Sequence, residues 1–152
     1  MPSHNSPKMI CLVEDNPNDE ALTLRALRKS NLANNIVVVR DGAEALDFLF
    51  CTGEYISRES AGLPAVVLLD LKLPKIDGLE VLRRIRANER TKLLPVVVMT
   101  SSDEHRDLLE SYRRGANSYV RKPIEFDRFT DTVQQLGRYW TTLNETSVRE
   151  GG

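Results

Sequence analysis

The stretch LPAVVLLDLKLP, residues 63–74, places Asp70 directly after an unbroken apolar run from Ala65 to Leu69. The run is rich in valine and leucine and shows no polar alternation. Strands that are buried on both faces have this composition, and they are typical of parallel sheets covered by helices on both sides. The stretch therefore predicts a central buried strand with an acidic residue at its carboxyl end.

Four further apolar runs repeat this pattern along the chain, separated by segments with helical periodicity. The runs are Met9 to Val13, Ile36 to Val39, Leu94 to Met99 and Ser118 to Val120. The segments between and after the strands predict helices over residues 17–29, 42–51, 78–88, 102–114 and 125–140. Five strand–helix units in succession predict an α/β, flavodoxin-like doubly wound (βα)5 fold, with a five-stranded parallel sheet in the order 2-1-3-4-5.

Polar residues at the expected helix starts support these assignments. An N-cap followed by acidic residues in the first turn is predicted at Asn16-Pro17. Pairs with capping-box spacing occur at Asp41 and Glu44, Asp77 and Glu80, and Ser101 and Glu104. Gly115 provides a stop before the last strand. The segment from Thr52 to Pro64 lies outside this plan and is expected to be a long polar connection.

Length and charge limit the classes of function. The chain has 152 residues, with 21 basic and 22 acidic side chains and a formal net charge of −1. We expect one domain over residues 8–140 and a polar C-terminal tail over 141–152. The balanced charge gives no electrostatic footprint for nucleic acid or an anionic membrane. No apolar run approaches the roughly 20 residues that span a bilayer, and residues 1–8 lack a signal-peptide core, so we expect a cytoplasmic protein.

Cysteine and histidine offer little chemistry in this sequence. Cys11 lies inside an apolar run and Cys51 follows one, so we expect two buried, reduced thiols. His4 and His105 lie far apart, and a zinc site or a histidine-based triad needs more partners than these two provide.

Polar side chains follow the strands on both sides of the predicted switch in strand order, where ligands bind in open parallel sheets. They are Glu14 and Asp15 after the first strand, Asp70 after the third, Thr100 and Ser101 after the fourth, and Arg121 and Lys122 after the fifth. Clustered carboxylates repel one another unless a cation joins them, and oxygen ligands of this kind suit Mg²⁺. A carboxylate can also act as a nucleophile toward phosphorus. Lys122 and Thr100 would then supply positive charge and a hydroxyl to the phosphoryl oxygens.

These residues resemble the receiver domains of two-component response regulators (CheY-like domains). The matching motifs are Leu12 to Asn16, Leu68 to Pro74, Asp77-Gly78, Met99 to Ser101 and Tyr119 to Pro123. The resemblance implies that a histidine kinase phosphorylates Asp70, and that the protein is a phosphoacceptor in signalling rather than an enzyme. It further implies that Asp15, Glu14 and Asp70 bind Mg²⁺ together with the backbone carbonyl of Lys72. Thr100 and Tyr119 would form the switch pair, and Lys122 would bind the phosphoryl group.

A narrower resemblance concerns the small single-domain regulators that partner phytochrome-type histidine kinases. It rests on the segments 51–55, 111–112 and 115–119 and on Tyr139-Trp140. It implies a phytochrome-type kinase as partner and a homodimer formed through the fourth helix, fifth strand and fifth helix. Phe126, Phe129, Val133 and Leu136 have the spacing to dock the last helix on the sheet. Tyr139, Trp140 and Leu143 lie beyond the expected cover of the sheet, so we predict that they contribute to the dimer contact.

Four other functions are compatible with parts of the pattern. A haloacid-dehalogenase-like hydrolase needs an acid two residues after the nucleophile, where this chain has Lys72. A DNA-binding output domain does not fit into residues 141–152. A flavodoxin-like electron carrier needs a phosphate-binding loop after the first strand, and Asp15-Asn16-Pro17 contains no glycine. A phosphorylation-independent interaction module stays open as the alternative.

Overall fold

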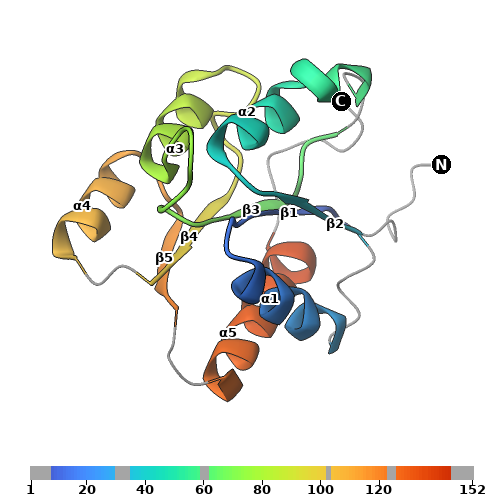
Figure 1. The fold of residues 1–152 in the computed structure, drawn as a ribbon, viewed down its shortest axis with the longest axis vertical. Helices are drawn as coiled ribbons and strands as arrows, with labels where there is room; N and C mark the ends of the chain where they lie inside the picture. The colour runs from blue at the N-terminus through green and yellow to red at the C-terminus, as the bar shows by residue number, and fades with distance from the viewer. Residues whose placement is uncertain (1–7, 30–34, 59–61, 102–103, 123–125, 145–152) are drawn as a thin grey trace.

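The computed structural model describes residues 8–29, 35–58, 62–101, 104–122 and 126–144. Five parallel strands form one sheet in the order β2-β1-β3-β4-β5, as predicted. The strands are β1 (Ile10–Val13), β2 (Ile36–Val39), β3 (Val66–Leu69), β4 (Val96–Thr100) and β5 (Ser118–Arg121). The helices are α1 (Pro17–Lys29), α2 (Gly42–Phe50), α3 (Gly78–Ala87), α4 (His105–Arg113) and α5 (Phe126–Arg138). Figure 1 shows α2, α3 and α4 on one side of the sheet and α1 and α5 on the other.

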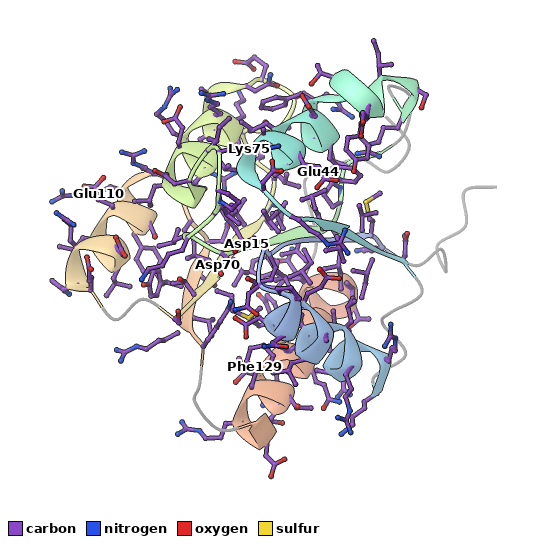
Figure 2. The ribbon with its side chains drawn as sticks, viewed as in Figure 1. Asp15, Glu44, Asp70, Lys75, Glu110 and Phe129 are labelled. Atoms are coloured by element: carbon purple, nitrogen blue, oxygen red, sulfur yellow. The ribbon has the colours of Figure 1, made fainter. Side chains whose placement is uncertain are left out.

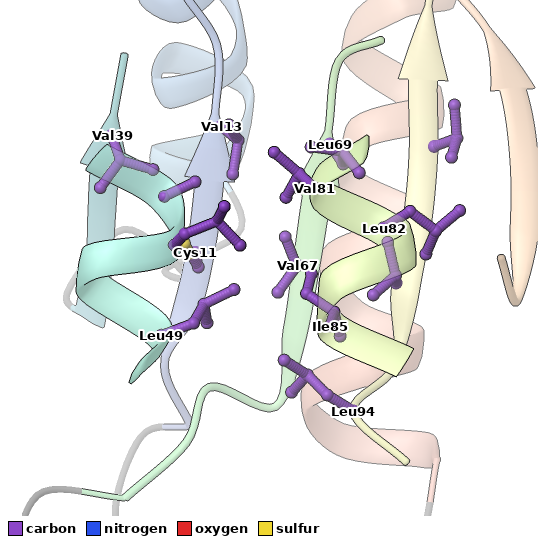
Figure 3. Close-up of a cluster of buried hydrophobic side chains, with 14 of the residues drawn as sticks. Cys11, Val13, Val39, Leu49, Val67, Leu69, Val81, Leu82, Ile85 and Leu94 are labelled. Carbon is purple, nitrogen blue, oxygen red and sulfur yellow. The ribbon is translucent and has the colours of Figure 1, made fainter. Parts of the chain in front are cut away.

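The core has two layers because successive residues of a strand point to opposite faces of the sheet. Cys11, Val67 and Leu69 face α2 and α3 in the first cluster, which Figure 3 shows. Leu12 and Leu68 belong to the second cluster, on the side of α1 and α5. All four residues of β1 and all four of β3 are buried. Both thiols, Cys11 and Cys51, are buried and free, as predicted.

Three predicted helix caps are present. The Asn16 side chain accepts hydrogen bonds from the backbone N–H groups of Asn18 and Asp19, at 2.9 and 3.1 Å. Asp41 accepts from the Glu44 N–H at 2.7 Å, and Asp77 accepts from the Glu80 N–H at 3.0 Å. Each of these bonds satisfies a donor that the first turn of a helix leaves without a partner.

The fourth cap prediction, at Ser101, is wrong. Helix α4 begins at His105, three residues later than predicted, and Glu104 occupies the N-cap position without a side-chain capping bond. Residues 102 and 103, with which the predicted helix began, lie outside the described residues. The end of α4 agrees better with the prediction, because Gly115 has a φ of +98° and turns the chain toward β5.

The connection before β3 is more ordered than the sequence indicated. A 3₁₀ helix, η2 (Gly53–Arg58), packs back against α2. The Arg58 guanidinium lies 3.7 Å from the centre of the Phe48 ring, and its Nε donates to the Phe48 carbonyl at 3.0 Å. The Tyr55 hydroxyl donates to Glu44 at 2.6 Å. Cation–π and hydrogen-bond contacts thus fix the first part of the segment that was expected to be a long polar connection.

The C-terminal end of the described chain corrects a second expectation. Helix α5 continues into a short π-helix, η3 (Tyr139–Leu143). Trp140 is 9% exposed and belongs to the second core cluster with Phe129 and Val133, so it does not extend beyond the cover of the sheet. Tyr139 is 47% exposed. The side chains of Phe126 and Leu143 and the tail from residue 145 lie outside the described residues. In the part of the chain that the structure describes, no helix combines the length and apolar character needed to cross a membrane.

Candidate functional site

The register of the central strands brings the predicted acidic residues to one edge of the sheet. Val13 and Leu69 are partners in neighbouring strands β1 and β3, so the residues that follow them leave the sheet side by side. The Asp70 N–H donates to the Val13 carbonyl at 3.1 Å, which extends the pairing by one step. Figure 2 shows Asp15 and Asp70 close together at this edge.

Three carboxylates form a compact cluster here. Glu14, Asp15 and Asp70 each offer an oxygen, and these oxygens all lie within 4.8 Å of one another. Glu14 is 1% exposed and Asp70 8%, whereas Asp15 is open to solvent. Like charges held this closely in a partly buried site repel one another, and oxygen donors in such a group are the ligands that Mg²⁺ prefers.

The Lys122 side chain lies within this cluster. Its ammonium donates to Glu14 Oε1 at 2.6 Å, to Asp19 Oδ2 at 2.8 Å and to Asp70 Oδ2 at 3.0 Å. The backbone of Lys122 is held by its N–H, which donates to the Thr100 carbonyl at 2.8 Å and prolongs the pairing of β5 with β4. The side chain of Lys122 is 6% exposed, so the ammonium acts as a buried counter-charge.

Burial and charge perturb the two most enclosed groups in this cluster. Burial raises the pKa of Glu14 to about 7, although the hydrogen bond and charge of Lys122 oppose the rise. Burial alone would lower the pKa of Lys122, but its hydrogen bonds with Asp19 and Glu14 and the charge of Asp70 raise that pKa above its usual value. The lysine is therefore firmly protonated, while Glu14 is costly to ionise.

The second oxygen of Asp70 is fixed by the loop that follows β3. Asp70 Oδ1 accepts a hydrogen bond from the Lys72 N–H at 3.1 Å. The loop is closed by the Gly78 N–H, which donates to the Leu71 carbonyl at 2.8 Å. A Cβ atom on Gly78 would lie only 2.4 Å from the Asp70 carbonyl oxygen, so glycine is required for this approach. No described contact tests the predicted role of the Lys72 carbonyl.

Thr100 and Tyr119 lie on β4 and β5, the two strands that follow β3 on one side of the sheet. Thr100 is completely buried at the end of β4, where it is the partner of Arg121. Tyr119 in β5 pairs with Val98 in β4. Its half-buried side chain packs against the first core cluster. The sheet therefore brings Thr100 to the same edge as Asp70, with Tyr119 two residues earlier than Arg121 on the neighbouring strand.

Sequence reasoning missed Asp19 as a member of the site. Acidic residues in a first helical turn are common because they favour the positive end of the helix dipole, and Asp19 was interpreted in that way. The structure shows the Asp19 carboxylate, in the first turn of α1, accepting a hydrogen bond from Lys122, which follows β5. A solvent-accessible groove beside the site is lined by Asp15, Lys72 and Asp107, among others.

Comparison with known proteins gives the family. The response regulator receiver domain model matches residues 10–134. The probable methanogenesis regulatory protein FilR2 of Methanothrix harundinacea is 41% identical over 92% of this chain and 88% of its own length. The response regulator Rcp1 of Synechocystis is 39% identical over 90% of each chain.

Solved structures agree with this result. The phosphorylated cyanobacterial phytochrome response regulator RcpA superposes with a TM-score of 0.86 at 37% identity, covering 93% of this chain and 99% of its own. The Mn²⁺-bound form of Rcp1 has a TM-score of 0.84 at 36% identity, with 92% and 99% covered. The bacteriophytochrome response regulator AtBRR is 54% identical, with a TM-score of 0.71 and 91% and 98% covered. Together with the acidic cluster and its buried lysine, these similarities show that the chain belongs to the response regulator receiver domain family.

Proposed function

We propose that this receiver domain accepts a phosphoryl group from a histidine kinase on Asp70. The observation that carries the proposal is the Asp70 carboxylate at the end of β3, 3.0 Å from the Lys122 ammonium and beside Glu14 and Asp15. An Asp70 oxygen attacks phosphorus, and the new P–O bond forms as the P–N bond to the kinase histidine breaks. The electron pair of that bond leaves with the imidazole.

The donor set fits a divalent cation, and we assign Mg²⁺ to it. Glu14, Asp15 and Asp70, with the backbone carbonyl of Lys72, would hold the ion. The support is the cluster of three carboxylates and the Mn²⁺-bound state of the related Rcp1. When bound, the cation neutralises charge on the transferred phosphoryl group. Lys122 supplies a further positive charge next to Asp70.

Thr100, Tyr119 and Lys122 are proposed to transmit the event. A phosphoryl group on Asp70 would attract the Thr100 hydroxyl and the Lys122 ammonium, and movement of Thr100 would leave room for the Tyr119 ring. The burial of Thr100 beneath the site and the half-buried position of Tyr119 support this model. Lys122→Ala should still be labelled but should show a weaker phosphorylation-induced change in its NMR spectrum. An unreduced change in both Lys122→Ala and Thr100→Ala would contradict the model.

The proposed kinase is of the phytochrome type. The similarity to phytochrome and bacteriophytochrome response regulators supports this choice, because AtBRR and RcpA match over more than nine-tenths of the chain. Phosphotransfer from a panel of purified histidine kinases would test it, and we expect the fastest transfer from a phytochrome kinase. Faster transfer from a kinase without a bilin-binding module would contradict this assignment and leave the Asp70 chemistry intact.

A homodimer through α4, β5, α5 and the following residues stays part of the proposal, with a changed anchor. Trp140 is buried in the core of its own chain. Tyr139 is the better candidate for the dimer anchor, because 47% of the residue is exposed. Its ring packs edge-on against Trp140, with the ring centres 5.0 Å apart. We expect light scattering to give a dimer for the parent and a weaker dimer for Tyr139→Ala. A monomeric parent, with or without a phosphoryl analogue, would remove the dimer from the proposal.

Labelling with acetyl phosphate tests the phosphorylation site itself. The parent should become labelled at one site in the presence of Mg²⁺, and Asp70→Asn should not. Asp77→Asn is the matched control, because Asp77 follows the same β3 loop but serves as the N-cap of α3. Unchanged labelling of Asp70→Asn would refute the assignment. A parent that is not labelled by acetyl phosphate or by any kinase would favour the alternative, a phosphorylation-independent interaction module.

A further inference from the structure

All three N–H donors of the Lys122 ammonium are engaged in the structure, which has no phosphoryl group on Asp70. An ammonium carries three N–H groups, and those of Lys122 are directed to Glu14, Asp19 and Asp70 at 2.6, 2.8 and 3.0 Å. A phosphoryl group on Asp70 adds anionic oxygens farther from the end of β3. Because all three donors are engaged, the lysine can bind those oxygens fully only by giving up a carboxylate.

The three acceptors differ in how easily water can replace the lysine. The side chains of Glu14 and Asp70 are 2% and 10% exposed, whereas the side chain of Asp19 is 31% exposed. Separating a buried carboxylate from its cation leaves an uncompensated charge in a poorly solvated place. Water can instead hydrate Asp19 when the lysine leaves. The bond to Asp19 is therefore the one that is exchanged at the lowest cost.

The position of Asp19 is fixed by local structure in α1. Its N–H donates to the Asn16 side chain at 3.1 Å, and its carbonyl accepts from the Thr23 hydroxyl at 2.8 Å. Thr23 is completely buried. Asn16 also donates its own N–H to Glu14 Oε2 at 3.3 Å. One short turn thus holds two of the three acceptors of Lys122 in place.

We propose that Asp19 is a positioning residue that keeps the Lys122 ammonium in its resting place and competes for it with the phosphoryl group on Asp70. The inference rests on the proposed function and adds to it a residue outside the acidic cluster and the switch pair. Asp19 lowers the affinity of the site for a phosphoryl group, because its bond to Lys122 must be released first. Removing its charge should favour the phosphorylated state.

The experiment measures binding of beryllofluoride, a phosphoryl analogue, in the presence of Mg²⁺ by ¹⁹F NMR titration. Asp19→Asn should bind it about threefold more tightly, as expected for the loss of one partly exposed ion pair from the resting state. Asp19→Glu keeps the charge and should bind with an affinity closer to that of the parent. Glu20→Gln is the matched control, because Glu20 is the next residue of the same turn but pairs with Arg40 at 2.8 Å. It removes the same charge without touching Lys122, and its affinity should equal that of the parent.

The outcomes separate this inference from the proposed function. An equal increase in beryllofluoride affinity in Asp19→Asn and Glu20→Gln would mean that only the loss of a negative charge near the site matters. That result would overturn the inference. Weaker binding by Asp19→Asn would also overturn it, because Asp19 would then assist the metal or the phosphoryl group. A parent that binds no beryllofluoride would overturn the proposed function and the inference with it.

Discussion

Replacing Glu14 with glutamine tests the electrostatic description of the site. Burial raises the pKa of this carboxyl from its usual 4.5 to about 7 in the folded, metal-free protein. A rise of this size corresponds to about 3 kcal/mol of folding free energy that ionisation of Glu14 removes. Because the residue is only 1% exposed, water does little to screen this cost.

The sign follows from the direction of the shift. The folded pKa of Glu14 lies above the unfolded value, so the stability contributed by its neutral form is fully present below pH 4.5. It is lost as the pH rises through about 7. Glutamine is neutral at every pH and keeps an oxygen that can accept from Lys122. We therefore expect Glu14→Gln to match the parent near pH 4 and to exceed it by about 3 kcal/mol at pH 8.

Urea denaturation in the presence of a chelator, from pH 4 to pH 8.5, measures this difference. Glu20→Gln serves as a control, because it removes the same charge from a carboxylate that pairs with Arg40 at 2.8 Å instead of Lys122. Adding Mg²⁺ should reduce the advantage of Glu14→Gln, since a ligand that binds only the folded parent stabilises it. A constant difference between Glu14→Gln and the parent across the whole range would refute the reasoning.

Three further predictions concern the surroundings of the site. Asn16→Ala should lower the free energy of unfolding in urea by about 1 kcal/mol, because it removes the N-cap acceptor for the Asp19 N–H; an unchanged midpoint would contradict this. Gly78→Ala should lower the free energy of unfolding by about 1–3 kcal/mol and slow acetyl phosphate labelling, because its Cβ would lie 2.4 Å from the Asp70 carbonyl oxygen. If thermal unfolding and labelling both matched the parent, the loop would be able to shift and accommodate the Cβ without cost. Burial raises the pKa of the Cys11 thiol to about 12, so a thiol reagent at pH 8 should label Cys11 only in unfolded protein. Equal labelling rates in native and unfolded samples, measured by mass spectrometry, would count against the burial of Cys11.

The central strands β1, β3 and β4 were predictable because they are buried on both faces, and the partly buried edge strand β2 because of its apolar run. The run Ile36 to Val39 became a strand with those bounds, and the strand order followed from the succession of strand–helix units. The start of β4 was predicted two residues early, at Leu94. Pro95 has no N–H for the ladder, and pairing begins at Val96, whose N–H donates to the Asn117 side chain.

Helix caps were predictable only where the spacing and the backbone agreed. The pair Asp41 and Glu44 forms a cap because Asp41 has the extended backbone that an N-cap requires. Ser101 and Glu104 share the same spacing, but the chain reaches helical geometry only after Glu104. A sequence pattern shows which side chains could cap, and the path of the loop decides where the helix begins.

The positions of Asp19 and Trp140 could not be read from spacing, because both depend on how distant elements pack. Asp19 and Lys122 are separated by 103 positions in sequence, and they meet because α1 and α5 pack on the same side of the sheet, next to the end of β5 (Figure 1). Trp140 lies four residues beyond Leu136 and so on the same helical face, but the sequence does not show how far the sheet covers that face. In the structure its ring belongs to the second core cluster.

The charge balance of the site links these observations to the proposed chemistry. Glu14, Asp19 and Asp70 share one ammonium, and Asp15 adds a further carboxylate beside them. A phosphodonor is itself anionic, so it meets an excess of negative charge that the lysine cannot offset, because its donors are already engaged. This charge balance supports the proposal that transfer to Asp70 needs a divalent cation. In the proposed phosphorylated state Lys122 would have to release one of its three carboxylates, and Asp19, whose side chain is the most exposed of the three, is the one that it would release at the lowest cost.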